Sequence, residues 1–414
     1  MHRLTGLLLA LAVSGCATAP AGEDLSSAAT AAPAFASLGE AHAAMEKVIR
    51  GGDADPFWRQ VLAHGAMPLV FGEQALFLWR GEARSVEWRG DFSSWSPSVA
   101  ASGCRLGTSN VWVYERQFPL DARLDYKLVI DGTTWLVDPL NPHQQTGGSG
   151  PNSEVRMPAW QVPANGIRRE GIPRGILSDD LAIVSTELGY VVNYRVYLPA
   201  GFERSTSKNL PVLYVSDGSD YWNDEMGSLV ITLDNLIARR RIVPIVAVFI
   251  DPWDRPKKDN RRQQELIPAT DRSCPFCEFV VRELVPAIDN AYPTWRGREG
   301  RAVLGTSLGG LHATLMATRY ASTFGMTGIQ SPAYQPAPWV LDSVRTTETL
   351  PLKTFINAGT FEPEVAENAR RLRAVLESRH AVVKQVEVHQ GHSWGQWRAL
   401  LDDMLRFFYG SEPG

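Results

Sequence analysis

The sequence predicts an α/β fold with a mostly parallel sheet, preceded by an all-β sandwich, and two patterns in its 414 residues carry this prediction. From about residue 195 onward, continuous apolar runs alternate with helical stretches, which is typical of a parallel sheet covered on both faces. Between residues 68 and 160, short alternating segments are separated by turn residues, as in a sandwich. We place the two domains at 38–165 and 166–414, which suits the length of the chain.

The composition is that of an ordinary globular protein, with 44% hydrophobic residues, 21% charged residues and a net charge of −4. The sequence holds no basic run and no stripe of basic and aromatic residues, so we expect no nucleic-acid partner.

Residues 1–16 have the features of an export signal. A basic start is followed by an apolar run that is too short to span a bilayer permanently. Val13-Ser14-Gly15-Cys16 then resembles a bacterial lipobox, which implies cleavage before Cys16 and lipidation of that cysteine; the alternative is a plain signal peptide. Ala17 resembles the outer-membrane sorting pattern, so we expect a periplasmic lipoprotein anchored to the outer membrane. Residues 17–37 are rich in small residues and proline, and predict a flexible tether.

The first domain begins with helical patterns at 38–50 and 57–62 and continues with strand patterns at 76–79, 86–88, 111–114, 126–130 and 134–137. Its tryptophans Trp88, Trp95 and Trp112 have two possible roles. They fill the core of the sandwich, which is the usual place of such rings, or they stack on a sugar or aryl ligand.

Three stretches of this domain carry a resemblance: Gly90-Asp91-Phe92-Ser93-Ser94-Trp95, residues 124–132, and Asp138-Pro139-Leu140-Asn141-Pro142. They resemble the early-set, immunoglobulin-like modules of glycogen-binding proteins. The same order also resembles the N-terminal domain of enterochelin (enterobactin) esterases. The resemblance implies an immunoglobulin-like sandwich.

In the second domain we expect strands at 193–199, 210–218, 243–250, 301–304, 354–358 and 383–388, with helices at 229–239, 279–292, 311–317, 365–376 and 397–408. Active residues of such a sheet should follow the carboxyl ends of its strands.

Gly305-Thr306-Ser307-Leu308-Gly309-Gly310 lies between a strand pattern and a helix pattern. Gly-x-Ser-x-Gly in this position is the nucleophile-elbow signature of α/β-hydrolases. The residues at 305 and 309 must lack bulk because strand and helix nearly touch there. The alternative is a glycine-rich turn with an incidental serine.

The chain order in this fold is serine, acid, histidine, and two later sites fit it. Glu362 follows a strand and precedes a helix, and His392 lies in a turn before the final helix. We expect His392 to accept the proton of Ser307 and Glu362 to orient the imidazole. The competing residues are Asp342 and Asp402 for the acid, His389 for the base, and His312, which we expect to serve packing.

Cys274-Pro275-Phe276-Cys277 has the spacing of a redox motif but lacks a thioredoxin-like surrounding pattern. We expect a local structural disulfide rather than a redox or metal site, because no second Cys/His pair has zinc-like spacing. We expect no cofactor.

Residues 195–408 resemble the esterase-D superfamily and, within it, the enterochelin esterase family. The matching stretches are 213–218 with Trp222, 262–266, the elbow, 359–363 and 391–398. The last usually reads Gly-Gly-His-Asp, whereas Gln390 and Ser393 stand here in place of the first Gly and the Asp. With the first domain, the resemblance covers about residues 56–410.

This resemblance implies hydrolysis of ester bonds in ferric siderophores such as enterobactin or its linear fragments. It assigns the oxyanion donors to the backbone N–H groups of Leu308 and Ser219. It also implies five substrate-binding residues: Asp217, Trp222, Arg262, Glu265 and Trp394. Arg262 could meet an anionic catecholate, and the alternative for Arg262 and Glu265 is a salt bridge within a loop. The export signal departs from the cytoplasmic members of the family but suits a periplasmic siderophore esterase.

Two other functions stay open. A feruloyl- or acetyl-xylan-type carbohydrate esterase would share the fold and differ in substrate. A surface glycan-binding lipoprotein with an inactive hydrolase domain belongs to another class, and the intact serine, histidine and acid argue against it.

Overall fold

The computed structural model describes residues 35–97, 102–204, 206, 209–255, 257–271 and 273–411. The expected signal peptide, Cys16 and most of the expected tether lie outside these residues. Phe35, inside the expected tether, is buried and stacks on Phe57 with ring centroids 5.7 Å apart. Residues 35–37 therefore belong to the folded unit and not to a tether.

Two helices open the N-terminal unit, α1 (Leu38–Ile49) and α2 (Ala54–His64). The Ser37 side chain accepts a hydrogen bond from the Glu40 N–H at 3.2 Å, and the Glu40 carboxylate accepts one from the Ala36 N–H at 2.7 Å, which together cap α1. Gly65 ends α2 in the left-handed conformation that glycine adopts without strain.

The N-terminal unit contains two antiparallel sheets. The first has the order β1-β2-β5-β4 and the second β3-β6-β9-β8, with β7 beside β6. Phe77 of the first sheet meets Tyr126 of the second edge to face, with centroids 5.1 Å apart, so the sheets pack face to face around an aromatic core. The strands are β1 (Leu69–Phe71), β2 (Gln74–Arg80), β3 (Val86–Gly90), β4 (Cys104–Arg105), β5 (Val111–Gln117), β6 (Arg123–Ile130), β7 (Thr134–Leu136), β8 (Gln144–Gly147) and β9 (Gly150–Arg156).

Trp88, Trp95 and Trp112, the tryptophans for which the sequence left two roles open, divide between those roles. Trp88 and Trp112 are buried in the core. Trp95 follows the short helix Asp91–Ser93 and stays half-buried at the surface. Only Trp95 of the three is therefore placed to meet a ligand.

The C-terminal unit is built on a nine-stranded sheet, and it confirms the predicted α/β class with a mostly parallel sheet. The order is β10-β12-β14-β13-β17-β18-β19-β20, with β11 beside β12, and all pairs from β14 to β20 are parallel. The strands are β10 (Ile176–Leu177), β11 (Leu181–Val184), β12 (Val191–Leu198), β13 (Val212–Val215), β14 (Val246–Asp251), β17 (Arg301–Thr306), β18 (Met326–Gln330), β19 (Lys353–Gly359) and β20 (Val382–Val388). A hairpin of β15 (Trp253–Asp254) and β16 (Asp259–Asn260) follows β14.

Helices cover both faces of this sheet, as continuous apolar strands require. One core contains side chains from α4 (Leu229–Ala238), α11 (Trp394–Ala399) and α12 (Leu401–Tyr409), and the other contains side chains from α6 (Pro275–Phe279), α7 (Val285–Ala291), α8 (Leu308–Arg319), α9 (Trp339–Ser343) and α10 (Pro363–Ser378). Two shorter helices, α3 (Gly218–Trp222) and α5 (Arg262–Leu266), follow strands near the carboxyl edge of the sheet.

Two predicted helices differ in detail. The helix predicted at 279–292 contains a π-helical turn, Val280–Leu284, before α7. Pro286 lacks an N–H and cannot continue the regular ladder, which accounts for the irregular turn before it. The helix predicted at 397–408 is two helices, α11 and α12, that meet at Leu400.

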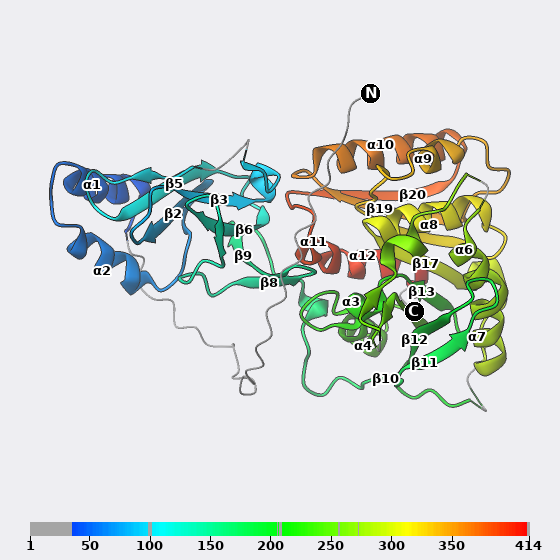
Figure 1. Cartoon of the computed structure of the whole chain (residues 1–414). Coiled ribbons are helices and arrows are strands. Elements are labelled where there is room, and N and C mark those ends of the chain that lie inside the picture. Colours follow the sequence, from blue (N-terminus) through cyan, green and yellow to red (C-terminus); the bar gives the residue numbers. More distant parts are fainter. Residues whose placement is uncertain are drawn as a thin grey trace, which may run out of the picture.

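The two units lie side by side, with α11 and β8 at their boundary (Figure 1). Among the described residues, no helix combines the length and the apolar character that crossing a membrane would need.

Candidate active site

Ser307 lies on a sharp turn between β17 and α8, with φ 57° and ψ −115°. This conformation is strained for a residue with a side chain, and the hydrogen bond from its N–H to the Gln330 carbonyl, 2.9 Å long, helps to hold it. A Cβ on Gly305 would collide with the backbone of Gly309. Close approach thus requires glycine at 305, as the motif predicts, whereas a Cβ on Gly309 would meet Asp217 Oδ2 only at 3.4 Å, which is an ordinary contact.

The structure brings His392 and Glu362 to this serine. The imidazole Nε2 lies 2.9 Å from Ser307 Oγ, and Nδ1 lies 2.5 Å from Glu362 Oε2. An imidazole that donates from Nδ1 to the carboxylate offers the Nε2 lone pair to the serine hydroxyl. The three side chains therefore form one hydrogen-bonded relay.

Glu362 is buried, and its second oxygen has partners of its own. Oε1 accepts hydrogen bonds from Ser331 Oγ and from the Gly359 N–H, both at 2.6 Å. Ser331 Oγ in turn accepts from Gln396 Nε2 at 3.0 Å and from Trp397 Nε1 at 2.9 Å. Since α11 supplies both donors, the helix after the histidine helps to fix the carboxylate.

The competing residues lie elsewhere. His389 pairs with Asp121 of the N-terminal unit at 2.6 Å, and His312 is buried in α8. Asp342 lies 3.8 Å from Arg371, and Asp402 pairs with Arg406 on α12. The structure joins none of these four to Ser307.

The two expected oxyanion donors begin helices that follow neighbouring strands. Leu308 is the first residue of α8 after β17, and Ser219 lies in the first turn of α3 after β13. β13 and β17 are paired in parallel, so both helix starts lie at the same edge of the sheet. N–H groups in a first helical turn have no partner within their own helix, which leaves them available to an oxyanion.

A cavity of about 730 Å³ opens over Ser307 and His392 and is lined by both units. The N-terminal unit contributes Trp95, Asp125, Lys127, Trp135, residues 146–150 and Asn152; the C-terminal unit contributes Asp220, Met226, Trp253, Asn260, Arg262, Thr306, Ser307, His392, Ser393, Trp394 and Trp397. Arg262 and Trp394, two of the five expected substrate-binding residues, are in this lining.

Arg262 combines the two roles that the sequence left open. It lines the cavity, and it also forms a bidentate ion pair with buried Asp217, with Nε–Oδ1 at 2.7 Å and Nη2–Oδ2 at 2.9 Å. Asp217 is the partner of Arg262 and is not among the described residues that line the cavity. Burial, with a smaller effect of Asp217, raises the pKa of neighbouring Asp220 to about 6.

Trp222 and Glu265, two further expected substrate-binding residues, are not among the described residues that line the cavity. Trp222 packs edge to face on Phe249, and the Arg195 guanidinium lies 4.6 Å from its ring centroid. Glu265 is buried and accepts a hydrogen bond from the Tyr190 hydroxyl at 3.1 Å. Burial raises the pKa of Glu265 to about 8.

Lys127, Trp135 and Trp253 are among the cavity residues that the sequence did not point to, whereas Trp95 was considered there as a ring that stacks on a ligand. Trp95 and Trp135 stack with centroids 6.4 Å apart, and the Arg89 guanidinium lies 5.4 Å from the Trp135 ring centroid. The one sequence signal for them was the Gly90–Trp95 loop motif. Their place beside Ser307 depends on how the two units dock, which no local pattern encodes.

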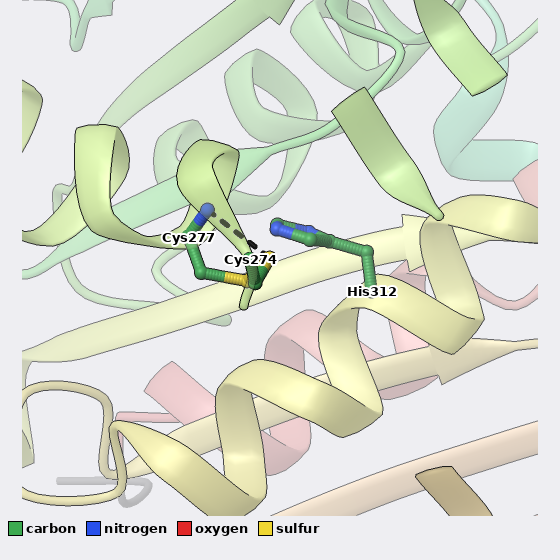
Figure 2. A group of neighbouring side chains, drawn as sticks. All are labelled: Cys274, Cys277 and His312. Atoms are coloured by element: carbon green, nitrogen blue, oxygen red, sulfur yellow. Dashed lines mark hydrogen bonds between the residues drawn. A yellow bond between two sulfur atoms is a disulfide. The ribbon is translucent and has the colours of Figure 1, made fainter. Parts of the chain in front are cut away.

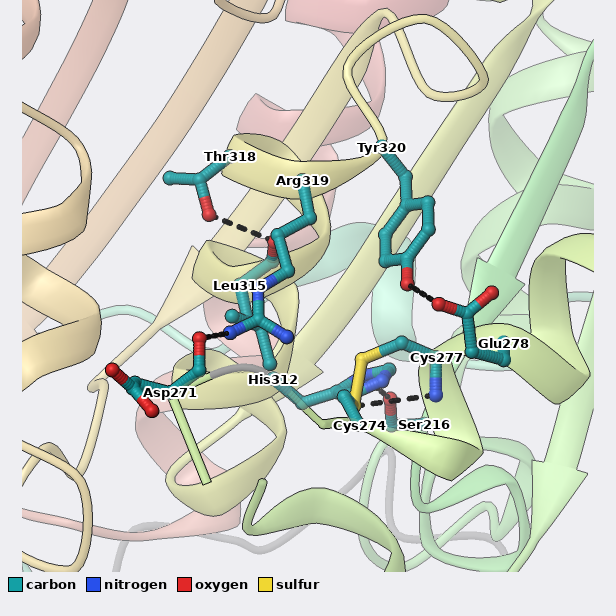
Figure 3. Close-up of a disulfide and its surroundings, with 10 residues drawn as sticks. All are labelled: Ser216, Asp271, Cys274, Cys277, Glu278, His312, Leu315, Thr318, Arg319 and Tyr320. Atoms are coloured by element: carbon teal, nitrogen blue, oxygen red, sulfur yellow. Dashed lines mark hydrogen bonds between the residues drawn. A yellow bond between two sulfur atoms is a disulfide. The ribbon is translucent and has the colours of Figure 1, made fainter. Parts of the chain in front are cut away.

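The expected local disulfide joins Cys274 and Cys277 at the start of α6 (Figure 2). His312 points toward it from α8, and Ser216 Oγ lies 3.4 Å from His312 Nδ1 (Figure 3). Complete burial lowers the pKa of His312 to about 4, so the ring stays neutral at ordinary pH. This histidine packs behind the elbow, as expected. Cys104 is a free, exposed thiol.

The family model described as "Putative esterase" matches residues 185–408. The iron(III) salmochelin esterase of Escherichia coli O6:H1 is 25% identical over 296 residues, covering 66% of this chain and 67% of that protein. The endo-1,4-beta-xylanase/feruloyl esterase of Xylanibacter ruminicola is 24% identical over 318 residues, covering 74% of this chain and 41% of that protein.

Among solved structures, the enterobactin esterase FES from Shigella flexneri superposes with a TM-score of 0.66 at 21% identity. The superposition covers 81% of this chain and 92% of that one, so the shared fold extends over both units. The resemblance to enterochelin esterases is confirmed. The chain therefore belongs to the esterase family, is a carboxylic ester hydrolase, and shares the fold of the enterobactin esterases.

Proposed function

We propose that this protein is a serine esterase whose catalytic residues are Ser307, His392 and Glu362. The observation that carries the proposal is the hydrogen-bonded relay of these three side chains beneath a cavity large enough for a multi-ring ester. A relay assembled from three separate loops argues against the alternative of an inactive, glycan-binding hydrolase domain.

The geometry supports a two-step acyl transfer. Ser307 Oγ forms a bond to the ester carbonyl carbon while its proton passes to His392 Nε2, and Glu362 stabilises the imidazolium. The negative charge on the carbonyl oxygen is met by the N–H groups of Leu308 and Ser219. The tetrahedral intermediate then expels the alcohol, which takes the proton from Nε2. Water, activated by the same imidazole, hydrolyses the acyl-enzyme and frees Ser307.

For the substrate we infer an ester of a catecholate siderophore of the enterobactin type. The salmochelin and enterobactin esterases match this chain over both units, and both units line the cavity. The exposed indole surfaces of Trp95 and Trp135 suit flat aryl rings. Lys127 and Arg262 suit the negative charge of catecholates and of their ferric complexes.

A feruloyl ester of plant cell-wall sugar is the second candidate. The match to the xylanase/feruloyl esterase spans 74% of this chain, a larger share than the 66% matched by the salmochelin esterase. A ferulate ring would use the same indole surfaces, so the fold does not separate the two substrates.

A paired assay separates them. Purified protein is given enterobactin and a feruloylated sugar at equal concentration, and the release of dihydroxybenzoyl-serine and of ferulate is followed by chromatography. We expect dihydroxybenzoyl-serine to be released faster. Faster release of ferulate would support the second candidate and contradict the first.

We further propose that the protein is a lipoprotein anchored to the outer membrane through Cys16. Incorporation of a labelled fatty acid into the wild-type protein, and its loss in Cys16→Ala, is the expected result. Equal labelling of both would contradict the anchor.

A further inference from the structure

The base His392 lies in a loop, residues 389–393, that links β20 to α11 and lies against the N-terminal unit. The Arg123 N–H donates to the His389 carbonyl at 3.1 Å, and Arg123 and Gln390 form a parallel bridge. We propose that Arg123 is a positioning residue for His392 and acts through Ser393; this proposal rests on the proposed catalytic triad. The N-terminal unit would then contribute to the chemistry as well as to the cavity wall.

The guanidinium of Arg123 is held in one orientation. It is completely buried, and its Nη2 lies 2.6 Å from Asp125 and 2.5 Å from Glu154, while Nε donates to Glu154 at 3.1 Å. The remaining nitrogen, Nη1, donates to Ser393 Oγ at 2.8 Å. A planar fork fixed by two carboxylates has no freedom to follow a moving loop, so it sets the position of Ser393.

Ser393 is the residue after His392 and occupies the N-cap position of α11, where its side chain makes no capping hydrogen bond. Its backbone is joined directly to His392 on one side and to Trp394 on the other. A displacement of Ser393 would change the direction of the His392 side chain, whose alignment with Ser307 Oγ at 2.9 Å depends on that backbone. Misplacement by about 1 Å can cost on the order of 10²-fold in rate.

Two glycines show how closely the loop follows the N-terminal unit. A Cβ on Gly391 would collide with the carboxylate of Asp91, and a Cβ on Gly395 would collide with the guanidinium of Arg123. Both residues lie within three positions of His392. Asp91 also accepts a hydrogen bond from the Asp125 N–H at 2.8 Å, so both contacts belong to the same buried polar cluster.

A purely structural explanation is that this cluster only docks the two units. Arg156 provides the matched control, because it pairs with Glu154 at 2.5 Å in the same cluster and stays partly exposed. Among the described residues its hydrogen-bonded partner is Glu154 and not a residue of the 389–393 loop, and it is not in the cavity lining. If the cluster only docks the units, Arg156→Gln and Ser393→Ala should have similar effects.

Ser393→Ala is the main test, since it removes the acceptor and leaves Arg123 paired with both carboxylates. Hydrolysis of p-nitrophenyl acetate is measured together with the rate at which a fluorophosphonate labels Ser307. We expect kcat and the labelling rate to fall about 10-fold, with KM within twofold. The unfolding midpoint should fall, because the buried Nη1–H of Arg123 loses its acceptor, so the rates are compared at a temperature where both proteins are folded. Ser393→Thr, which keeps the hydroxyl, should retain most of the activity, and Arg156→Gln should keep kcat within twofold.

Arg123→Lys is the second variant, because it keeps the charge between Asp125 and Glu154 but loses the fork. We expect a similar fall in kcat, and little further loss when Ser393→Ala is added to it, since both changes break the same bond. Wild-type kcat in Ser393→Ala, or an equal fall in Arg156→Gln, would overturn the proposal. Failure of the proposed triad is a separate result, namely a wild-type protein that the fluorophosphonate does not label at Ser307.

Discussion

The backbone of Ser307 explains why the proposed nucleophile can be recognised from so short a motif. Its φ of 57° needs neighbours without side-chain bulk, and the collision that a Cβ on Gly305 would cause shows how little room there is. The requirement is local, so it is written in the local sequence. Asp217, after the neighbouring strand β13, has a similar φ of 54°.

Replacing Ser307 by alanine removes the only atom of the relay that can attack an ester carbon. We expect kcat for an activated aryl ester to fall by about 10⁵-fold, because alanine has no hydroxyl. The fold should be unchanged, because alanine has less bulk than serine. The rate is measured on p-nitrophenyl acetate, and circular dichroism checks the fold. Activity that survives the change would contradict the triad.

Replacing Glu362 by glutamine tests the acid. The amide can still accept from Ser331 and Gly359, but it removes the negative charge that stabilises the imidazolium, so we expect kcat to fall by about 10³- to 10⁴-fold. The control is Glu364→Gln, an exposed carboxylate two positions later in the first turn of α10. A similar rate in the two variants would assign the acid elsewhere.

At the scale of elements, α5 carries an unusual buried carboxyl. Glu265 lies near the end of this five-residue helix and receives the Tyr190 hydroxyl. Family resemblance placed Glu265 at the substrate, whereas the structure pairs it with Tyr190, the residue before β12. Of the described residues of α5, Arg262 is the one that lines the cavity. The difference follows from helical geometry, because residues three apart share a face only approximately and a short helix at the edge of a cavity exposes one side.

The raised pKa of Glu265 predicts how stability depends on pH. With a pKa of about 8 in the folded protein and an ordinary value in the unfolded chain, the folded protein holds the extra proton between these values. Its contribution to stability is therefore complete below pH 4 and is lost as the pH rises through about 8. Between pH 6 and pH 9 we expect Glu265→Gln to lose less stability than wild type, by about 2 kcal/mol. Urea unfolding at the two pH values measures the difference, and equal losses would show that Glu265 is ionised when folded.

The whole molecule explains which part of the site could be predicted from the sequence. Ser307, Glu362 and His392 each follow a strand of one sheet, and parallel strands bring their carboxyl ends together, so chain order was enough to select them. Trp135, Lys127 and Trp253 reach the cavity through the docking of two units and through the hairpin after β14, and neither is encoded in a motif. The partner of His389 shows the same limit, because the competing histidine pairs with Asp121 of the other unit, a contact that no local pattern encodes.

Because both units line the cavity, we expect a change in the N-terminal unit to affect the kinetics of large substrates and not those of small ones. Trp135→Ala removes an indole that is 43% exposed and stacked on Trp95. We expect KM for enterobactin to rise on the order of 5-fold, and the kinetics on p-nitrophenyl acetate to stay unchanged, because the small ester does not reach the N-terminal unit. Trp295→Ala is the control, since Trp295 is also 43% exposed but is not in the cavity lining. An equal effect of both changes would show that Trp135 does not contact substrate.

The close fit of Gly391 and Gly395 against Asp91 and Arg123 has a consequence for protein engineering. A chimaera that joins this hydrolase unit to a sandwich from another protein would need both partners of those glycines at the junction, or the histidine loop would lose its support. A functional graft must therefore transplant the boundary as a matched pair of surfaces.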